Sequence, residues 1–259
     1  MLLDGRVAVV SGVGPGLGRA TALALAREGA AVGLAARTEA TLEKIAGEIV
    51  AAGGRALPVP TNVADAEACQ RAVDATAAEF GGLDVLVNSA FRPSTFQPFD
   101  AADLVTWRKV YEVNVWGSLA LTQAAVPYIK KRGGGSVVFV NSMESRKVRH
   151  GSGDYASSKG ALLVAARALA MELGPHHIRV NSVVPGWMWG PNVQVYVDWQ
   201  SGERGVTTEE IVAEITDEIP LGTIPPSEDV AEAIVFFASD MSRSITGQSL
   251  GVNGGEWFD

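Results

Sequence analysis

The sequence has few of the residues that disulfides, metal sites and membrane spans require. Cys69 is the one cysteine among 259 residues, so no internal disulfide is expected, and no Cys/His cluster suggests a zinc site. No run reaches the roughly 18 apolar residues of a membrane span, and Asp4 and Arg6 interrupt the N-terminal apolar stretch before it resembles a signal peptide. We therefore expect no metal, no membrane partner and a reducing, cytoplasmic location.

Charged side chains are few, and acidic ones outnumber basic ones. Charged residues make up 19% of the chain, and 29 acidic against 21 basic side chains give a formal charge of -8. This balance argues against a protein that mainly binds nucleic acid. Hydrophobic residues make up 47%, which is enough for a sizeable core and excludes a mostly disordered chain.

Short β-branched runs alternate with longer alanine-rich stretches. Several of the short runs are almost continuously apolar, as expected of strands covered on both faces. The alternation predicts parallel pairing with right-handed crossovers, and hence an α/β fold: a Rossmann-like, doubly wound open parallel sheet in a single domain, residues 1–259. The predicted strands are 6–11, 31–36, 56–60, 83–88, 136–141, 179–184 and 249–252. The predicted helices are 17–27, 39–50, 65–80, 101–129, 154–173, 208–219 and 227–238, with N-caps at Thr38 and Ser227 and stops at Gly29, Gly53 and Gly174.

A glycine-rich turn, SGVGPGLG, joins the first predicted strand to the first predicted helix. Gly12, Gly16 and Gly18 suit a tight turn that brings backbone N–H groups close to a pyrophosphate at the positive end of a helix dipole. A side chain at Gly16 would block that approach. The spacing differs from the G-x-G-x-x-G dinucleotide fingerprint, and the alternative is an ordinary strand–helix turn.

The end of the second predicted strand indicates which dinucleotide would bind. An acidic residue about 20 positions after the glycines would hold the ribose hydroxyls of NAD and repel the 2′-phosphate of NADP. The chain has no such acid and offers Arg37, a cation that favours NADP. The alternatives are NAD as the cofactor and a merely solvated arginine at a strand end.

Tyr155 and Lys159 are four residues apart in a predicted helix and therefore share one face. A neighbouring ammonium lowers the pKa of a phenol, as needed to protonate a carbonyl oxygen, or deprotonate an alcohol, during hydride transfer.

A hydroxyl at Ser142, which ends a predicted strand, could donate to the same substrate oxygen, although serines commonly end strands. Asn114 needs a partner if buried, and its alternative interpretations are a satisfied core asparagine or a helix irregularity.

These motifs resemble those of the short-chain dehydrogenase/reductase family over essentially the whole chain. SGVGPGLG resembles the family's T-G-x-x-x-G-x-G, with Ser11 in place of threonine. TNVAD resembles the segment that lines the adenine, with Asn62 in place of aspartate, and VNSA resembles N-N-A-G, with departures at Ser89 and Phe91. VVPG resembles the family's P-G motif, and ITGQSLGVNGG resembles its C-terminal segment.

The resemblance implies roles for particular residues. Tyr155 would be the acid/base, Ser142 would orient the substrate oxygen, Lys159 would lower the phenol's pKa and bind the nicotinamide ribose, and Asn114 would hold a proton-relaying water. Gly190 stands where the family often has a threonine that contacts the carboxamide. A homotetramer is also implied. The implied cofactor-binding residues are Gly12, Gly16, Leu17, Gly18, Arg37, Asn62, Val63, Asn88, Ala90, Tyr155, Lys159, Pro185, Gly186 and Met188.

Residues 187–225 are predicted to form a substrate lid within the single domain. Three of the six tryptophans, at 187, 189 and 199, favour an apolar or ring-bearing small-molecule substrate. The alternative is that these rings pack the lid or an oligomer contact. The candidate substrate residues are Glu144, which closely follows Ser142, and Trp187 and Trp189.

The sequence therefore predicts an oxidoreductase that transfers a hydride between NADP(H) and a secondary alcohol or ketone. The alternatives are an NAD-dependent alcohol dehydrogenase on the same scaffold and a non-catalytic nucleotide-sensing protein.

Overall fold

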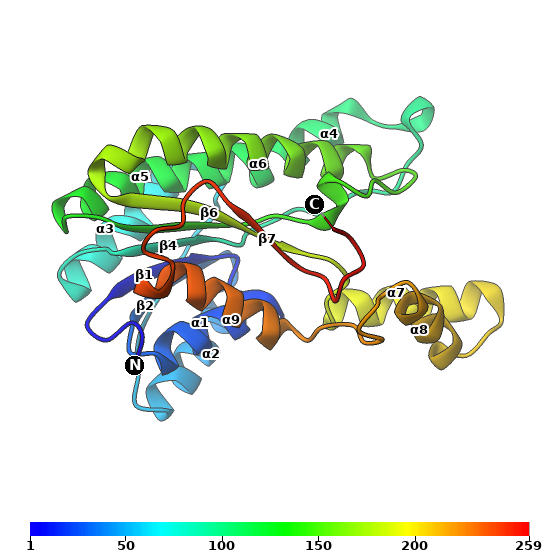
Figure 1. Cartoon of the computed structure of the whole chain (residues 1–259), viewed down its shortest axis with the longest axis horizontal. Helices are drawn as coiled ribbons and strands as arrows, with labels where there is room; N and C mark the ends of the chain where they lie inside the picture. Colours follow the sequence, from blue (N-terminus) through cyan, green and yellow to red (C-terminus); the bar gives the residue numbers. More distant parts are fainter. Residues whose placement is uncertain (259) are drawn as a thin grey trace.

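Seven parallel strands form one open sheet in the computed structural model, which describes residues 1–258 (Figure 1). The strand order is β3-β2-β1-β4-β5-β6-β7, so the chain first builds outward from β1 in one direction and then, from β4, in the other. Ligands of such sheets bind at the carboxyl ends of the strands where this reversal occurs. The strands are β1 (Val7–Ser11), β2 (Ala31–Ala36), β3 (Arg55–Pro60), β4 (Val85–Asn88), β5 (Gly135–Val140), β6 (Ile178–Pro185) and β7 (Ser249–Val252).

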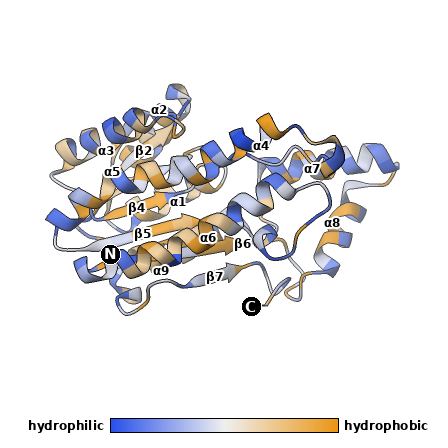
Figure 2. Cartoon of the chain, turned by 90° about the horizontal axis from the view of Figure 1, so that it is seen from above, coloured by the Kyte–Doolittle hydropathy of each residue, from blue (hydrophilic) through white to orange (hydrophobic). Residues whose placement is uncertain are grey.

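Helices cover both faces of the sheet (Figure 1). One face carries α1 (Leu17–Arg27), α2 (Glu39–Ala51) and α9 (Ser227–Ala238). The other carries α3 (Ala66–Phe80), α5 (Ser118–Lys131) and α6 (Gly153–Leu173). Side chains alternate between the faces along each strand, so Ala8 and Val10 of β1 join the first core, and Val7 and Val9 join the second. Figure 2 shows the central strands in the hydrophobic colours that this double burial requires.

The predicted α/β fold is confirmed, and every predicted strand is present with its ends shifted by at most two residues. The single predicted helix at 101–129 is wrong. That region consists of α4 (Leu104–Tyr111), a π-helical segment (Glu112–Gly117) and α5. Gly117 lies so close to Val63 that an added Cβ would be 2.8 Å from the Val63 carbonyl oxygen, and the side chain of Asn114 is fully buried. The helix irregularity that the sequence analysis gave as one alternative for Asn114 is therefore present. The contact with Val63 comes from outside the helix, which is why the residue pattern of the helix alone could not decide between the alternatives.

The predicted caps are partly wrong. Ser227 is the first residue of α9 rather than its N-cap, which is Pro226, and the Ser227 hydroxyl donates to the Trp189 carbonyl at 3.3 Å. Thr38 is the N-cap of α2, but its side chain makes no capping hydrogen bond. Gly29 and Gly53 follow their helices with positive φ, as predicted.

The segment at 187–225 contains a helix that the sequence analysis missed, α7 (Pro191–Arg204), together with α8 (Thr208–Asp217). The two helices stand apart from the sheet (Figure 1) and share a small core of their own. The buried members of that core are Val197, Ile211, Ile215 and Ile219. No helix within residues 1–258 is long and apolar enough to cross a membrane.

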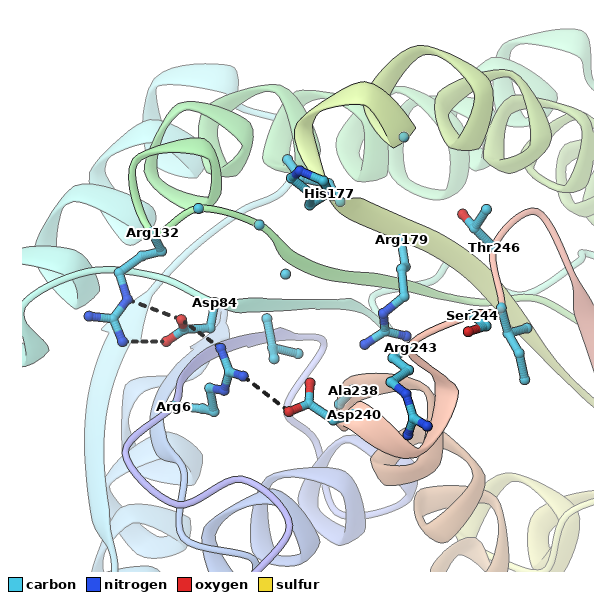
Figure 3. Close-up of a pocket in the computed structure, with 17 residues that line it drawn as sticks. Arg6, Asp84, Arg132, His177, Arg179, Ala238, Asp240, Arg243, Ser244 and Thr246 are labelled. Atoms are coloured by element: carbon cyan, nitrogen blue, oxygen red, sulfur yellow. Dashed lines mark hydrogen bonds and ion pairs between the residues drawn. The ribbon is translucent and has the colours of Figure 1, made fainter.

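Arginines gather at the amino ends of the strands, around a cavity of about 470 Å³ (Figure 3). Arg132 donates to both carboxylate oxygens of the buried Asp84, and Arg6 bridges Asp84 and the exposed Asp240. Asp84 also accepts from the backbone N–H of Val7 at 2.8 Å. Arg179 donates to the carbonyls of Phe237 and Ser239, at the end of α9. These contacts hold the amino ends of the strands and the end of α9 together. The amino-end edge of the sheet therefore has a structural role.

We expect Asp84→Ala to lower the free energy of unfolding by about 2 kcal/mol or more, because a buried N–H without an acceptor costs about 1–3 kcal/mol and two guanidinium contacts are lost as well. Urea unfolding checks this. Asp240→Ala removes the exposed carboxylate of the same network and is the matched control, with an expected change below about 1 kcal/mol. Equal losses in the two variants would contradict the structural role of Asp84.

Candidate active site

Two adjoining cavities lie at the carboxyl ends of β1, β4, β5 and β6. One, of about 250 Å³, is lined by Ser142, Tyr155 and Lys159 together with the glycine turn. The other, of about 490 Å³, is lined by Arg37 and Asn62. They share Gly12, and together form a cleft with the glycine turn in the middle. The predicted site residues that line it are Gly12, Gly16, Leu17, Gly18, Arg37, Asn62, Val63, Ala90, Ser142, Tyr155, Lys159, Pro185, Gly186 and Met188.

The three glycines of the turn are needed for different reasons. Gly12 has φ +73°, and a Cβ there would lie 2.5 Å from the backbone of Ala90; a Cβ on Gly18 would strike the Gly12 carbonyl. These two allow the backbone to pack. At Gly16 the nearest atom to an added Cβ is 3.9 Å away, on Pro191, so its missing side chain leaves open space in the cleft.

Backbone donors face this space. Arg19 and Ala20 donate to Gly14 and Gly16, but within residues 1–258 the N–H groups of Gly16, Leu17 and Gly18 donate to no carbonyl. They are the free donors at the amino end of α1, where the helix dipole is positive. Such an end is suited to an anion.

Lys159 positions Tyr155 against the end of β5. The residue is 2% exposed, and its ammonium donates to the Val140 carbonyl at 2.8 Å and lies 5.7 Å from the centre of the Tyr155 ring. Burial lowers the pKa of Lys159 to about 7. Burial also raises the pKa of Tyr155, a hydrogen bond with Ser142 opposes that rise, and the charge of Glu144 adds to it. The net shift of the phenol's pKa is upward, and the lowering predicted from the neighbouring lysine is not among its causes.

Asn114 is fully buried in the π-helical segment, and its amide is saturated. Its Oδ1 accepts from the backbone N–H of Arg92 at 2.7 Å, and its Nδ2 donates to the Arg92 carbonyl and to the Ser158 hydroxyl. The amide therefore ties the loop after β4 to α6, beside Lys159 but without a bond to it. Asn88 is buried outside the cleft lining, where its Nδ2 donates to Thr122.

Asp154 is a residue of the site that the sequence analysis missed. It is 1% exposed, accepts from the backbone N–H of Tyr155 at 2.7 Å, and lies 2.6 Å from the Ser94 hydroxyl. It thus fixes the same loop to the first turn of α6. An acid in the first turn of a predicted helix, next to the candidate tyrosine, was the available signal; its loop partner is distant in sequence.

The candidate substrate residues lie outside the two cavities. The Arg149 guanidinium stacks 4.1 Å over the Trp187 ring, which in turn packs against Tyr196 of α7. Trp189 is 40% exposed, and its backbone pairs with the segment before α9. Glu144 lies in the turn directly after Ser142, whose hydroxyl accepts from the Glu144 N–H.

Comparison with known proteins agrees with this geometry. A family model described as enoyl-(acyl carrier protein) reductase matches residues 12–256. The short-chain reductase protein NovJ of Streptomyces niveus is 35% identical over 96% of this chain and 93% of its own. The chain belongs to the short-chain dehydrogenase/reductase family. It is an oxidoreductase of the kind that acts on CH–OH groups.

Two solved structures of this family contain a nicotinamide dinucleotide. The L-sorbose reductase of Gluconobacter frateurii, complexed with NADPH and L-sorbose, superimposes with a TM-score of 0.94 at 29% identity, over 99% of this chain and 98% of the other. A 7α-hydroxysteroid dehydrogenase complexed with NADH and a 7-oxo bile acid gives 0.87 at 29% identity, over 98% and 94%. Short-chain dehydrogenase/reductases thus use either cofactor with alcohol- and ketone-type substrates.

We expect Asn114→Ala to release the loop after β4. Amide exchange at Arg92 should accelerate by about fivefold, because the N–H loses a buried acceptor with a net contribution of about 1 kcal/mol. Hydrogen–deuterium exchange followed by peptide mass spectrometry measures this. Gln70→Ala, which removes an exposed amide from α3, is the control. Unchanged exchange at Arg92 would contradict the anchoring role.

Proposed function

We propose that this short-chain dehydrogenase/reductase transfers a hydride between NADP(H) and a secondary alcohol or ketone with an apolar or cyclic body. The observation that carries the proposal is the meeting of Ser142, Tyr155 and Lys159 in one cavity that is continuous with the glycine turn. A nucleotide-sensing protein would need the turn but not these three side chains.

The cleft fits a dinucleotide. The free N–H groups of Gly16, Leu17 and Gly18 suit the pyrophosphate, and the open space at Gly16 admits it. Asn62 and Val63 would hold the adenine. Ala90 after β4, and Pro185, Gly186 and Met188 at the end of β6, would hold the nicotinamide half, whereas Asn88 at the end of β4 lies outside this lining.

Arg37 favours NADP over NAD. Its exposed guanidinium has no partner within residues 1–258, and it lines the same cavity as the hydroxyl-bearing Thr38 and Thr41. A 2′-phosphate there would gain a charge-assisted hydrogen bond and meet no carboxylate of β2. Both cofactors occur in related structures, so the preference comes from this residue alone.

The nicotinamide would supply or take the hydride, and the chain's own residues handle the proton. Tyr155 Oη gives its proton to the carbonyl oxygen in reduction and takes it back in oxidation. Ser142 Oγ holds that oxygen beside the phenol. Lys159 would bind the ribose and stabilise the phenolate by its charge. Asn114 anchors the loop next to this pair through Arg92 and Ser158, and the relay water that the family resemblance implies remains a prediction.

The lid at 187–225 supports a ring-bearing substrate. The ring of Tyr196 packs in a tilted arrangement against those of Trp187 and Trp199, with centroids 5.1 Å and 6.2 Å away. The hydroxysteroid dehydrogenase among the similar structures acts on a fused-ring substrate, and the sorbose reductase on a sugar. A homotetramer and a cytoplasmic location remain predictions.

Tyr155→Phe tests the acid/base assignment. We expect NADPH binding to persist and turnover to fall at least about 100-fold, the low end of general acid–base contributions. A panel of cyclic ketones and alcohols followed by nicotinamide absorbance gives the rates, and fluorescence titration gives the binding. Tyr128→Phe, which removes a remote phenol bound to Asp74, is the matched control. Near-normal turnover in Tyr155→Phe would show that the assignment is wrong.

Arg37→Ala tests the cofactor preference. The ratio of kcat/KM for NADPH to that for NADH should fall by about 10- to 100-fold, as expected from one hydrogen bond between charged groups. Arg55→Ala at the start of β3 is the control, since Arg55 lies over the Phe80 ring, away from the cleft. A preference for NADH in the parent that survives Arg37→Ala would overturn NADP as the cofactor.

A further inference from the structure

Phe91 lies at the junction of the two cavities that form the cleft. It lines both of them, and the other residues common to the two linings are Gly12, Gly14, Pro15 and Ser89, so Phe91 carries the largest side chain at this junction. The residue is 45% exposed, which leaves much of an apolar ring without cover from the chain. An uncovered apolar surface in a concave site is typical of a wall that contacts a ligand.

The Phe91 ring lies beside the phenol that handles the proton. Its centre is 6.3 Å from the centre of the Tyr155 ring, and the two rings meet edge to face at 66°, a favourable arrangement for an aromatic pair. In the proposed reaction Tyr155 Oη bonds to the substrate oxygen, so the carbon that exchanges the hydride lies next to the phenol. A group bonded directly to that carbon therefore comes closest to Phe91, whereas a group several bonds away can extend past the ring.

The backbone on both sides of Phe91 is held in place. On one side, the Ala90 N–H donates to the Ser11 hydroxyl at 3.3 Å. On the other side, the Arg92 N–H donates to Oδ1 of the buried Asn114 at 2.7 Å. The ring is thus attached to a fixed segment before any ligand binds, as suits a wall that selects substrates by shape.

A ring at this position is a property of this chain rather than of the motif. In the motif N-N-A-G that VNSA resembles, a glycine stands where this chain has Phe91. A glycine there would leave the junction without a side chain. Phe91 narrows the junction and adds an aromatic surface to it, and so changes which substrates fit beside Tyr155.

We propose that Phe91 is a specificity-determining residue whose ring packs against a ring bonded directly to the carbon that exchanges the hydride. The inference rests on the proposed hydride transfer. It narrows the substrate class from alcohols and ketones with an apolar or cyclic body to those whose ring is adjacent to the reacting carbon.

Two isomeric ketones that differ only in the position of the ring test the proposal. The phenyl ring of butyrophenone is bonded to the carbonyl carbon, and that of benzylacetone is two carbons further away. Both are compared in the parent, Phe91→Ala and Phe91→Tyr, with NADPH and with NADH. The quantities measured are kcat/KM from nicotinamide absorbance, and the dissociation constants of each ketone and of NADPH from tryptophan fluorescence.

Phe99→Ala is the matched control. Phe99 also follows β4 and also meets an aromatic ring edge to face, that of Trp107 at 5.9 Å, but it lines neither cavity. Circular dichroism confirms that each variant is folded.

We expect the ratio of kcat/KM for butyrophenone to that for benzylacetone to fall by about 2- to 10-fold in Phe91→Ala, the contribution of one aromatic pair. The ratio should stay at the parent's value in Phe91→Tyr, which keeps the ring, and in Phe99→Ala. The different intrinsic reactivities of the two ketones cancel, because the same pair is compared in every variant. The dissociation constant of NADPH should not change.

The outcomes separate the two proposals. An unchanged ratio in Phe91→Ala, or an equal fall in kcat/KM for both ketones, would overturn the substrate contact and leave hydride transfer standing. The equal fall would indicate that Phe91 supports only Tyr155 or the nicotinamide. A Phe91-dependent preference for butyrophenone in binding, without turnover by the parent, would overturn hydride transfer and leave the contact. Absence of both turnover and a binding preference would overturn both.

Discussion

The hydrogen bond from Lys159 to the Val140 carbonyl is the contact on which the site depends. It joins α6 to the carboxyl end of β5 and thereby brings Tyr155, one helical turn earlier, to Ser142, two residues beyond Val140. The bond requires a lysine whose charge has been removed from water, and burial lowers its pKa to about 7 as a result. Burying a lysine costs desolvation free energy and adds little to folding stability. Lys159 therefore serves the site through its position and charge rather than the stability of the fold.

Within the glycine turn, two glycines are needed for backbone packing and the third leaves open space in the cleft. Gly12 and Gly18 are required by neighbouring backbone, whereas Gly16 borders empty space and three free N–H groups. The hypothesis of an ordinary strand–helix turn therefore accounts for Gly12 and Gly18 but does not account for Gly16. The open space and the unpaired donors at the positive end of the helix dipole suit an anionic ligand.

Sequence patterns were informative where the determinants are local. Short β-branched runs predicted every strand, and the four-residue spacing of Tyr155 and Lys159 placed both on one helix face. The same patterns did not predict side-chain contacts whose two residues lie far apart in the sequence. The bonds from Asn114 to Arg92 and Ser158, and from Asp154 to Ser94, join residues up to 60 positions apart. Helix α7 was missed because its sequence, PNVQVYVDWQSGER, has no clear apolar stripe, and its one fully buried residue, Val197, lies in the small core that α7 shares with α8.

The pKa shifts of Tyr155 and Lys159 affect carbonyl reduction and alcohol oxidation differently. Burial raises the pKa of Tyr155 and lowers that of Lys159, so each shift favours the uncharged form of its group. A phenol with a raised pKa is fully protonated at neutral pH and ready to donate, which suits reduction of a carbonyl. Oxidation of an alcohol needs the phenolate, and therefore either a higher pH or a compensating charge. Lys159, with a pKa near neutrality, can supply that charge only below its pKa, so the two requirements oppose each other as pH rises.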